Sequence, residues 1–156
     1  MKKLTTICII TILTILTTSF TKNQSQSDVI SKIQELLVHA EGMTYVDISG
    51  NEVKITGQKI TQNSITRYTT ETLKNKKTNW ESKISNINWD ADFEQYTTEV
   101  RGNQKLVECV FQFENYDMMV TINEVGKNDI APFNTSGVSY FILDKDYEKF
   151  IALTKK

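Results

Sequence analysis

The sequence is poor in the residues that form linkers and chemical sites. Its 156 residues include one proline, six glycines, two cysteines and one histidine. So little proline and glycine leaves no Pro-rich or Gly/Ser-rich linker, and the length suits a single domain. Zinc takes three or four Cys, His or carboxylate ligands at defined spacing. A single histidine and one predicted core cysteine cannot supply such a set. The sequence therefore argues against a metal site, and it contains no glycine-rich phosphate loop that would hold a nucleotide cofactor.

The chain also lacks an excess of either positive or negative charge. The formal net charge is −1, and no run of basic residues forms a stripe. Nucleic-acid binding depends on such a basic footprint, so we expect no nucleic-acid partner. Hydrophobic residues make up 39% of the chain and charged residues 24%, which is a globular rather than a disordered composition.

The N-terminus has the pattern of a secretory leader. Lys2 and Lys3 precede an apolar stretch at residues 4–16, followed by small and polar residues. That stretch is shorter than the roughly 18 apolar residues of a spanning helix. We predict a signal peptide at residues 1–22, cleaved between 18 and 25, with an uncleaved anchor as the alternative. The mature protein would be secreted or periplasmic in a bacterial cell envelope, without a stable membrane anchor.

The remainder is predicted to be a flexible segment at residues 23–27 and one globular domain at residues 28–156. A helix capped by Ser27 or Asp28 is indicated by apolar residues at helical spacing, and Gly42 ends it. That apolar stripe consists of Val29, Ile30, Ile33, Leu36, Leu37 and Ala40.

From residue 43 the hydrophobic period changes to two, which is typical of strands. A hairpin is predicted around Ser49-Gly50-Asn51. Further strands are expected within residues 59–73, 106–113, 117–125 and 137–143, with loops at 74–78 and 126–136. Asp144 is expected to cap a last helix, whose apolar side contains Tyr147, Phe150, Ile151 and Thr154.

This order predicts a β-rich α+β fold. An N-terminal helix precedes an antiparallel meander of six to eight strands, which forms a bent sheet or incomplete barrel with a C-terminal capping helix. From residue 45 to the end, the arrangement resembles pleckstrin-homology-like and GRAM-like barrels. The resemblance is architectural, because no diagnostic motif of those families and no phosphoinositide-binding Lys/Arg cluster is present. A lipocalin-like barrel and a cystatin-like sheet are the alternatives.

Residues 76–93 contain both tryptophans and a row of acids. Trp80, Ile84 and Ile87 follow helical spacing, which predicts one helical turn. Residues 87–94 then alternate between apolar and polar, which predicts a strand with Trp89 facing the core. A calcium-loop pattern also begins at residue 88, but Phe93 stands where the sharp turn of that loop needs glycine. We therefore expect no metal here.

On such a strand Asp90, Asp92 and Glu94 would share the polar face, about 7 Å apart. Carboxylates at that separation suit a glycosidic bond, a cation or a basic partner. A solvated face is the simpler interpretation, because charged rows are common on antiparallel sheets. Phe133, in the longest loop, is the other candidate for ligand contact.

Two single residues, His39 and Cys109, are the remaining candidates for chemistry. His39 lies at the edge of the helical stripe without a nucleophile motif, which favours a structural role. Cys109 alternates with core residues, which predicts a buried and inert thiol.

The sequence contains no catalytic motif, so we predict that the protein is not an enzyme. The leading hypothesis is an exported, small, non-catalytic binding or interaction module for an unknown protein or small ligand. One alternative is an exported inhibitor or immunity-type protein that binds a basic partner through the acids at 90–94. Another is a hydrolase that uses those carboxylates. Oligomeric state is left open.

The leader predicts a size difference between the new and the exported chain. Intact-mass measurement of the protein from the periplasm or medium should show loss of 18 to 25 residues. An unprocessed chain in the membrane fraction would contradict the export hypothesis.

Overall fold

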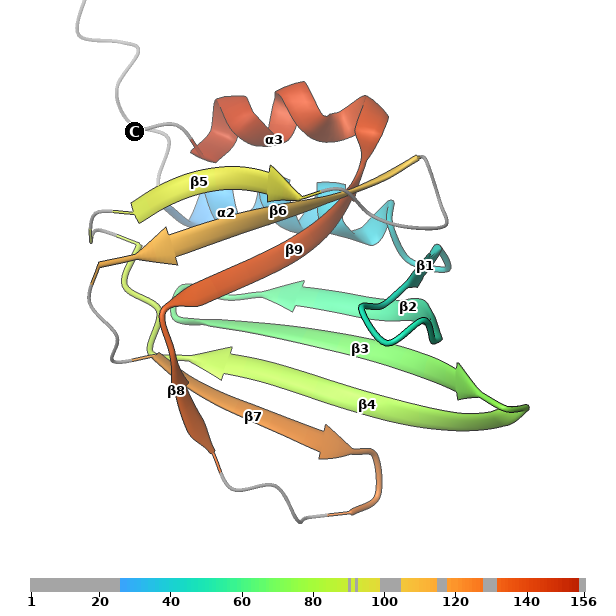
Figure 1. Cartoon of the computed structure of the whole chain (residues 1–156). Helices are drawn as coiled ribbons and strands as arrows, with labels where there is room; N and C mark the ends of the chain where they lie inside the picture. Colours follow the sequence, from blue (N-terminus) through green and yellow to red (C-terminus); the bar gives the residue numbers. More distant parts are fainter. Residues whose placement is uncertain are drawn as a thin grey trace, which may run out of the picture.

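The computed structural model describes residues 26–89, 91, 93–98, 105–114, 118–127 and 132–154. The predicted leader lies outside these residues. Helix α2 (Gln26–Val38) comes first and helix α3 (Tyr147–Thr154) last, preceded by the 3-10 turn η1 (Asp144–Asp146) (Figure 1). Nine strands are described between them: β1 (Thr44–Val46), β2 (Glu52–Ile60), β3 (Ser64–Leu73), β4 (Lys76–Ser85), β5 (Phe93–Thr98), β6 (Leu106–Phe113), β7 (Met118–Glu124), β8 (Phe133–Thr135) and β9 (Gly137–Leu143).

The predicted α+β, strand-rich fold is confirmed. Every described strand pair is antiparallel, and the strands form two sheets that do not close into a barrel. Sheet A has the order β1-β2-β3-β4-β7-β8, and sheet B has the order β5-β6-β9. The chain is thus not a simple meander, because β5 and β6 leave sheet A and β7 returns to pair with β4.

The predicted first helix and hairpin are confirmed with shifted ends. Helix α2 already begins at Gln26, so Asp28 lies in its first turn, where a carboxylate stabilises the helix dipole. Gly42 has a φ of 84°, a left-handed conformation that suits glycine after a helix. Strands β1 and β2 then pair from Thr44 opposite Lys54 to Val46 opposite Glu52.

Several local predictions are wrong. The loop expected at 74–78 is a two-residue turn, because Lys74 and Asn75 both take positive φ and let β3 and β4 continue to either side of it. Trp80 lies inside β4 rather than on a helical turn. Short β8 occupies part of the loop expected at 126–136.

The strand expected at residues 87–94 is wrong at residues 87–89 and 91, since β5 begins only at Phe93. Asn86 has a φ of 64°, which ends β4, and the backbone N–H of Ile87 donates to the carbonyl of Asn63 across the sheet end. Trp89 nevertheless faces the core, as predicted, where its ring lies edge-on to that of Phe111. Ile87, Trp89 and Ala91 all pack against the main core, which accounts for the alternation without a strand at these residues.

Asp144 is not the side-chain cap that the sequence suggests. Leu143 stands at the cap position of η1 without a side-chain cap bond, and the N–H of Tyr147 donates to the carbonyl of Asp144. The 3-10 turn thus supplies a backbone partner at the start of α3.

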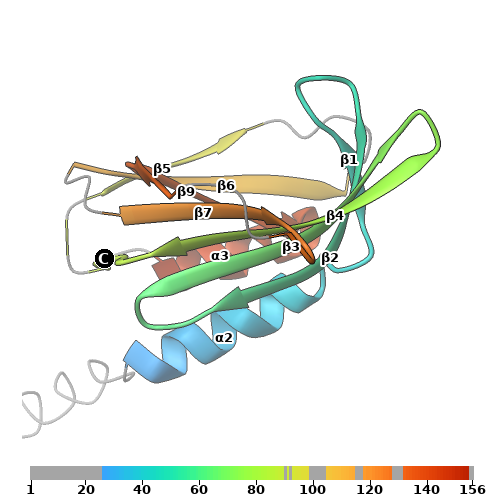
Figure 2. The same cartoon turned by 90° about the horizontal axis from the view of Figure 1, so that it is seen from below.

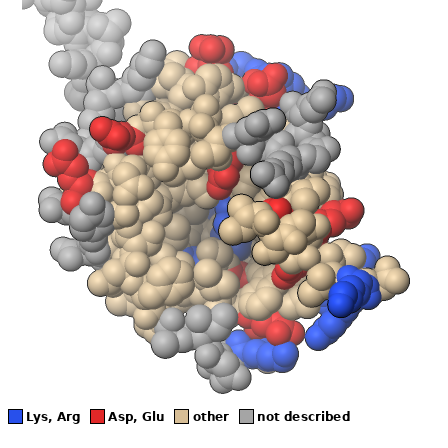
Figure 3. All heavy atoms as spheres, in the orientation of Figure 1, with Lys and Arg blue, Asp and Glu red and all other residues tan. Residues whose placement is uncertain are grey.

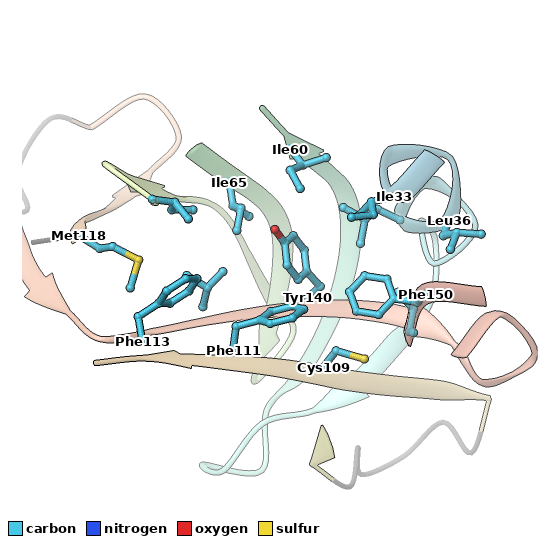
Figure 4. Close-up of a cluster of buried hydrophobic side chains, with 14 residues drawn as sticks. Ile33, Leu36, Ile60, Ile65, Cys109, Phe111, Phe113, Met118, Tyr140 and Phe150 are labelled. Carbon is cyan, nitrogen blue, oxygen red and sulfur yellow. The ribbon is translucent and has the colours of Figure 1, made fainter. Parts of the chain in front are cut away.

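The main core lies between sheet B, the two helices and the inner face of sheet A (Figure 4). Tyr140, Phe111 and Phe150 form its centre, with ring centroids 5.7 to 5.9 Å apart. These aromatic rings and the fully buried Leu37 account for the largest buried side chains of the described residues. Burial of such side chains is the dominant favourable term in folding.

Two glutamine side chains hydrogen-bond to backbone groups at strand edges where no neighbouring strand pairs. Gln58 is buried, with 4% of its surface exposed. Its side-chain amide donates to the Phe141 carbonyl (2.7 Å) and the Leu37 carbonyl (3.2 Å) and accepts from the Phe141 N–H (2.9 Å). Gln34 of α2 bonds in the same two-point manner to the Gln58 carbonyl and the Ile60 N–H, both at 2.8 Å. Figure 2 shows α2 running along β2, where Gln34 makes these bonds. Buried backbone groups must be paired, so each amide replaces a missing strand.

Replacing Gln58 should therefore damage the junction of the two sheets. Gln58→Ala leaves the Phe141 N–H and carbonyl buried without this partner, and we expect it to lower the free energy of unfolding by about 2–4 kcal/mol. Gln62→Ala, at an exposed turn position, is the control and should change it by less than about 0.5 kcal/mol. Equal urea midpoints for the two variants would contradict this assignment.

Candidate functional site

The residues singled out from the sequence fall in different places. Asp90 and Asp92 lie outside the described residues. Glu94 is exposed on β5, opposite Gln112 of β6. Phe133 is 48% exposed on β8 at the edge of sheet A, opposite Val120. Glu94 and Phe133 thus belong to different sheets.

A hollow lies where sheet B meets sheet A. Strand β9 is an edge strand of sheet B, and its residues Ser139 and Phe141 contact the inner face of sheet A, at Gln58 and Arg67. The main core fills one side of this junction, and a smaller buried cluster, which includes Phe141 and Leu106, packs on the other. On the other side the surface is hollowed near the centre of the view, with basic atoms at the floor (Figure 3). Contacts and charge effects link Arg67 to the residues by which we define this inter-sheet hollow: Tyr45, Glu71 and Trp80 of sheet A, and Glu108, Ser139 and the buried Phe141 of sheet B.

The register explains why these side chains face one another. Residues directly opposite on antiparallel strands share a face, and alternate residues along a strand return to it. Arg67 stands opposite Gln58 and Ser82, and Trp80 opposite Thr69, so all lie on the inner face. In sheet B, Phe141 stands opposite Glu108, on the face turned away from the main core.

Arg67 is half-buried and held from two sides. Its guanidinium carbon lies 5.0 Å from the centroid of the Phe141 ring, a cation–π contact. One terminal nitrogen donates to the Ser139 hydroxyl at 3.3 Å. Phe141 in turn stacks on Tyr45, with ring centroids 4.5 Å apart. The position of the charge is therefore fixed by aromatic packing.

The neighbouring acids are engaged elsewhere. Glu71 accepts from the Asn51 side chain (2.7 Å) and from the Trp80 indole N–H (2.9 Å). Glu108 accepts from the Thr98 hydroxyl at 2.8 Å. Among the described residues, no carboxylate forms an ion pair with Arg67. The guanidinium thus keeps most of its five N–H donors for other acceptors.

Tyr45 adds a neutral hydroxyl beside these charges. Burial raises the pKa of Tyr45 above its ordinary value, Arg67 opposes this shift, and Glu108, Asp47 and Glu71 add to it. The phenol therefore remains protonated well above neutral pH and can donate a hydrogen bond. The hollow combines a cation, a phenol and aromatic surface, which is a set of groups suited to binding.

Sequence reasoning missed Arg67, although one signal was available. Arg67 alternates with Ile65 and Thr69 on a strand whose inner face is apolar at Ile65. A charged residue on the same face as a buried isoleucine is unusual and marks a position that needs a partner.

A second concavity lies between the two helices. This groove of about 790 Å³ is lined mainly by apolar surface and includes Leu36, Val38, His39 and Leu153. The His39 Nδ1 lies 2.8 Å from a carboxylate oxygen of Asp146, which is 3% exposed. An imidazole oriented by a carboxylate is half of a hydrolytic triad, but the residues lining the groove include no hydroxyl or thiol to serve as nucleophile. The pair instead joins the end of α2 to the start of α3.

Within the described part of the chain, no group of three or more His, Cys, Asp or Glu side chains is placed to hold a metal ion. None of the helices described is long and apolar enough to span a membrane.

Comparisons with protein-family models, with curated proteins and with solved structures each found no match for this chain.

Cys109 is buried as predicted, with 0% exposure. Burial, with a smaller contribution from the neighbouring Glu108, raises the pKa of its thiol from 9.0 to about 12. Because the thiolate is the reactive species, native protein at pH 8 should label with a disulfide reagent only as fast as the fold opens. Protein unfolded in urea should label rapidly and stoichiometrically. Rapid labelling of the native protein would contradict this placement.

The same shift has a pH consequence. An unfolded thiol ionises first as the pH rises, so the stability contributed by the neutral folded thiol is complete below pH 9 and is lost as the pH rises toward 12. A Cys109→Ala variant should lack this component of the alkaline destabilisation, which urea titrations between pH 8 and pH 11 would measure.

Proposed function

We propose that this protein is a small, non-catalytic binding module and that its ligand site is the inter-sheet hollow. The observation that carries the proposal is the half-buried Arg67, which is fixed by Phe141 and Ser139 yet has no carboxylate partner among the described residues. Partial removal of a charge from water costs free energy, because hydrogen bonds to water are lost. A ligand that hydrogen-bonds to the charge in a concave surface regains part of that free energy.

Export belongs to the same proposal. The basic start and the short apolar stretch at residues 4–16 support a leader, and the mature domain would then act in the envelope or the medium. A stable fold there rests on the core, because only Cys109 would remain and one cysteine forms no disulfide within the chain.

The hollow favours a binding module over the two alternatives. An inhibitor or immunity-type protein and a carboxylate hydrolase both depend on the acids at 90–94, of which Glu94 is described and is exposed on β5. The hollow holds a cation with free donors and aromatic rings, and its two acids, Glu71 and Glu108, are already hydrogen-bonded to neighbouring side chains.

A fragment screen followed by NMR tests the site. Chemical-shift changes caused by bound fragments should cluster on hollow residues, including the Trp80 indole N–H. Ser82 faces the hollow opposite Arg67, so Ser82→Trp should fill it and weaken fragment binding at least tenfold.

Ser85→Trp is the matched control, because Ser85 lies on the same strand with its side chain on the opposite face of sheet A. It should leave fragment binding unchanged, and urea unfolding would show that both variants are folded. Shifts confined to the groove between α2 and α3, or equal loss in both variants, would contradict the proposed site.

A further inference from the structure

We infer that the inter-sheet hollow selects a ligand with a single carboxylate attached to an aromatic or apolar body. This inference rests on the proposed binding function and names the chemistry that the site recognises.

The carboxylate follows from the free donors of Arg67. A guanidinium has five N–H donors in a planar fork, and the described residues use it for one bond, to Ser139 at 3.3 Å. Two parallel bonds from such a fork match the two oxygens of a carboxylate. The Phe141 ring already holds the guanidinium, 5.0 Å from its centroid. Little side-chain freedom is therefore lost when a ligand binds.

The acids around Arg67 limit the charge of that ligand. Glu71 and Glu108 lie in the same hollow and would repel any anion, a doubly charged one such as the phosphate dianion about twice as strongly as a carboxylate. Both acids have donors of their own, from Asn51, Trp80 and Thr98, so neither needs Arg67 as a partner. A ligand with one negative charge, held by two bonds to Arg67, therefore meets less repulsion than one with two.

Aromatic surface accounts for the apolar body. Tyr45 and Trp80 are partly exposed at the hollow, and both are anchored by contacts, Tyr45 against Phe141 and Trp80 through its N–H to Glu71. Anchored rings offer contact area at low entropic cost.

Titrations with matched probes test the inference. Phenylacetate, phenylacetamide, phenethylamine and inorganic phosphate would each be added to millimolar concentration, while NMR follows the Arg67 side-chain N–H and the Trp80 indole N–H. Phenylacetate should bind at least tenfold tighter than phenylacetamide, because charge-assisted bonds to arginine are stronger than neutral ones. The amine and phosphate should not shift these signals.

Arg67→Gln and Arg67→Lys should both remove the preference for phenylacetate, since lysine keeps the charge but lacks the fork. Lys83→Gln is the control, because it removes an equal charge from the opposite, exposed face of β4 and should retain the preference. Arg67→Lys keeps the test valid if Arg67→Gln proves unstable in urea.

The outcomes separate the two proposals. If phenylacetamide or phenethylamine shifts the hollow signals as strongly as phenylacetate does, the carboxylate inference is overturned and the binding module stands. If Lys83→Gln loses the preference as Arg67→Gln does, the preference is a net-charge effect and the inference is overturned. If no probe shifts a hollow signal, both the inference and the proposed site are overturned.

Discussion

The side-chain amide of Gln58 is the interaction on which the arrangement of the two sheets depends. Among the described strands, sheet A and sheet B share no ladder of paired backbone groups. Strand β9 instead places its free edge against the inner face of sheet A, and the Gln58 amide bonds to both backbone groups of Phe141 there. A buried, fully bonded amide tolerates few other geometries, so it fixes where β9 stands.

The inter-sheet hollow is a consequence of that position. With β9 edge-on to sheet A, apolar residues fill one side of the junction, where Tyr140 contacts the aromatic core. On the other side, Phe141 meets Arg67, which stands directly opposite Gln58 on β3. The residue that closes the junction and the residue proposed to bind ligand are therefore neighbours on one face. The shape of the hollow and the position of its charge share a single cause.

Features that depend on local pattern could be predicted from the sequence. The apolar stripe of α2 and the alternation in β6 gave the correct elements, including the buried Cys109, because periodicity reports directly on which face is buried. The same method failed between Trp80 and Phe93. There, helical spacing arose by coincidence on strand β4, and alternation arose on an irregular segment. Short periodic patterns do not identify one backbone geometry.

Contacts between distant residues could not be predicted in this way. Gln58 and Phe141 are 83 positions apart, and no local pattern joins a polar residue on one strand to the edge of another. Arg67 is likewise placed by packing of β3 against β9. Once β5 and β6 leave sheet A for sheet B, β4 pairs with β7, and this pairing is set by the whole fold rather than by adjacent turns. The candidate site therefore became visible only with the fold.

Hydrogen exchange at the Phe141 amide tests this account most directly. Its N–H donates to a side chain rather than to a strand, so a Gln58→Leu variant should accelerate exchange at Phe141 while amides within the β6–β9 ladder stay protected. NMR exchange rates for the natural and variant proteins would show this selective loss. Fast exchange at Phe141 in the natural protein, or unchanged protection in the variant, would contradict the claim that Gln58 joins the two sheets.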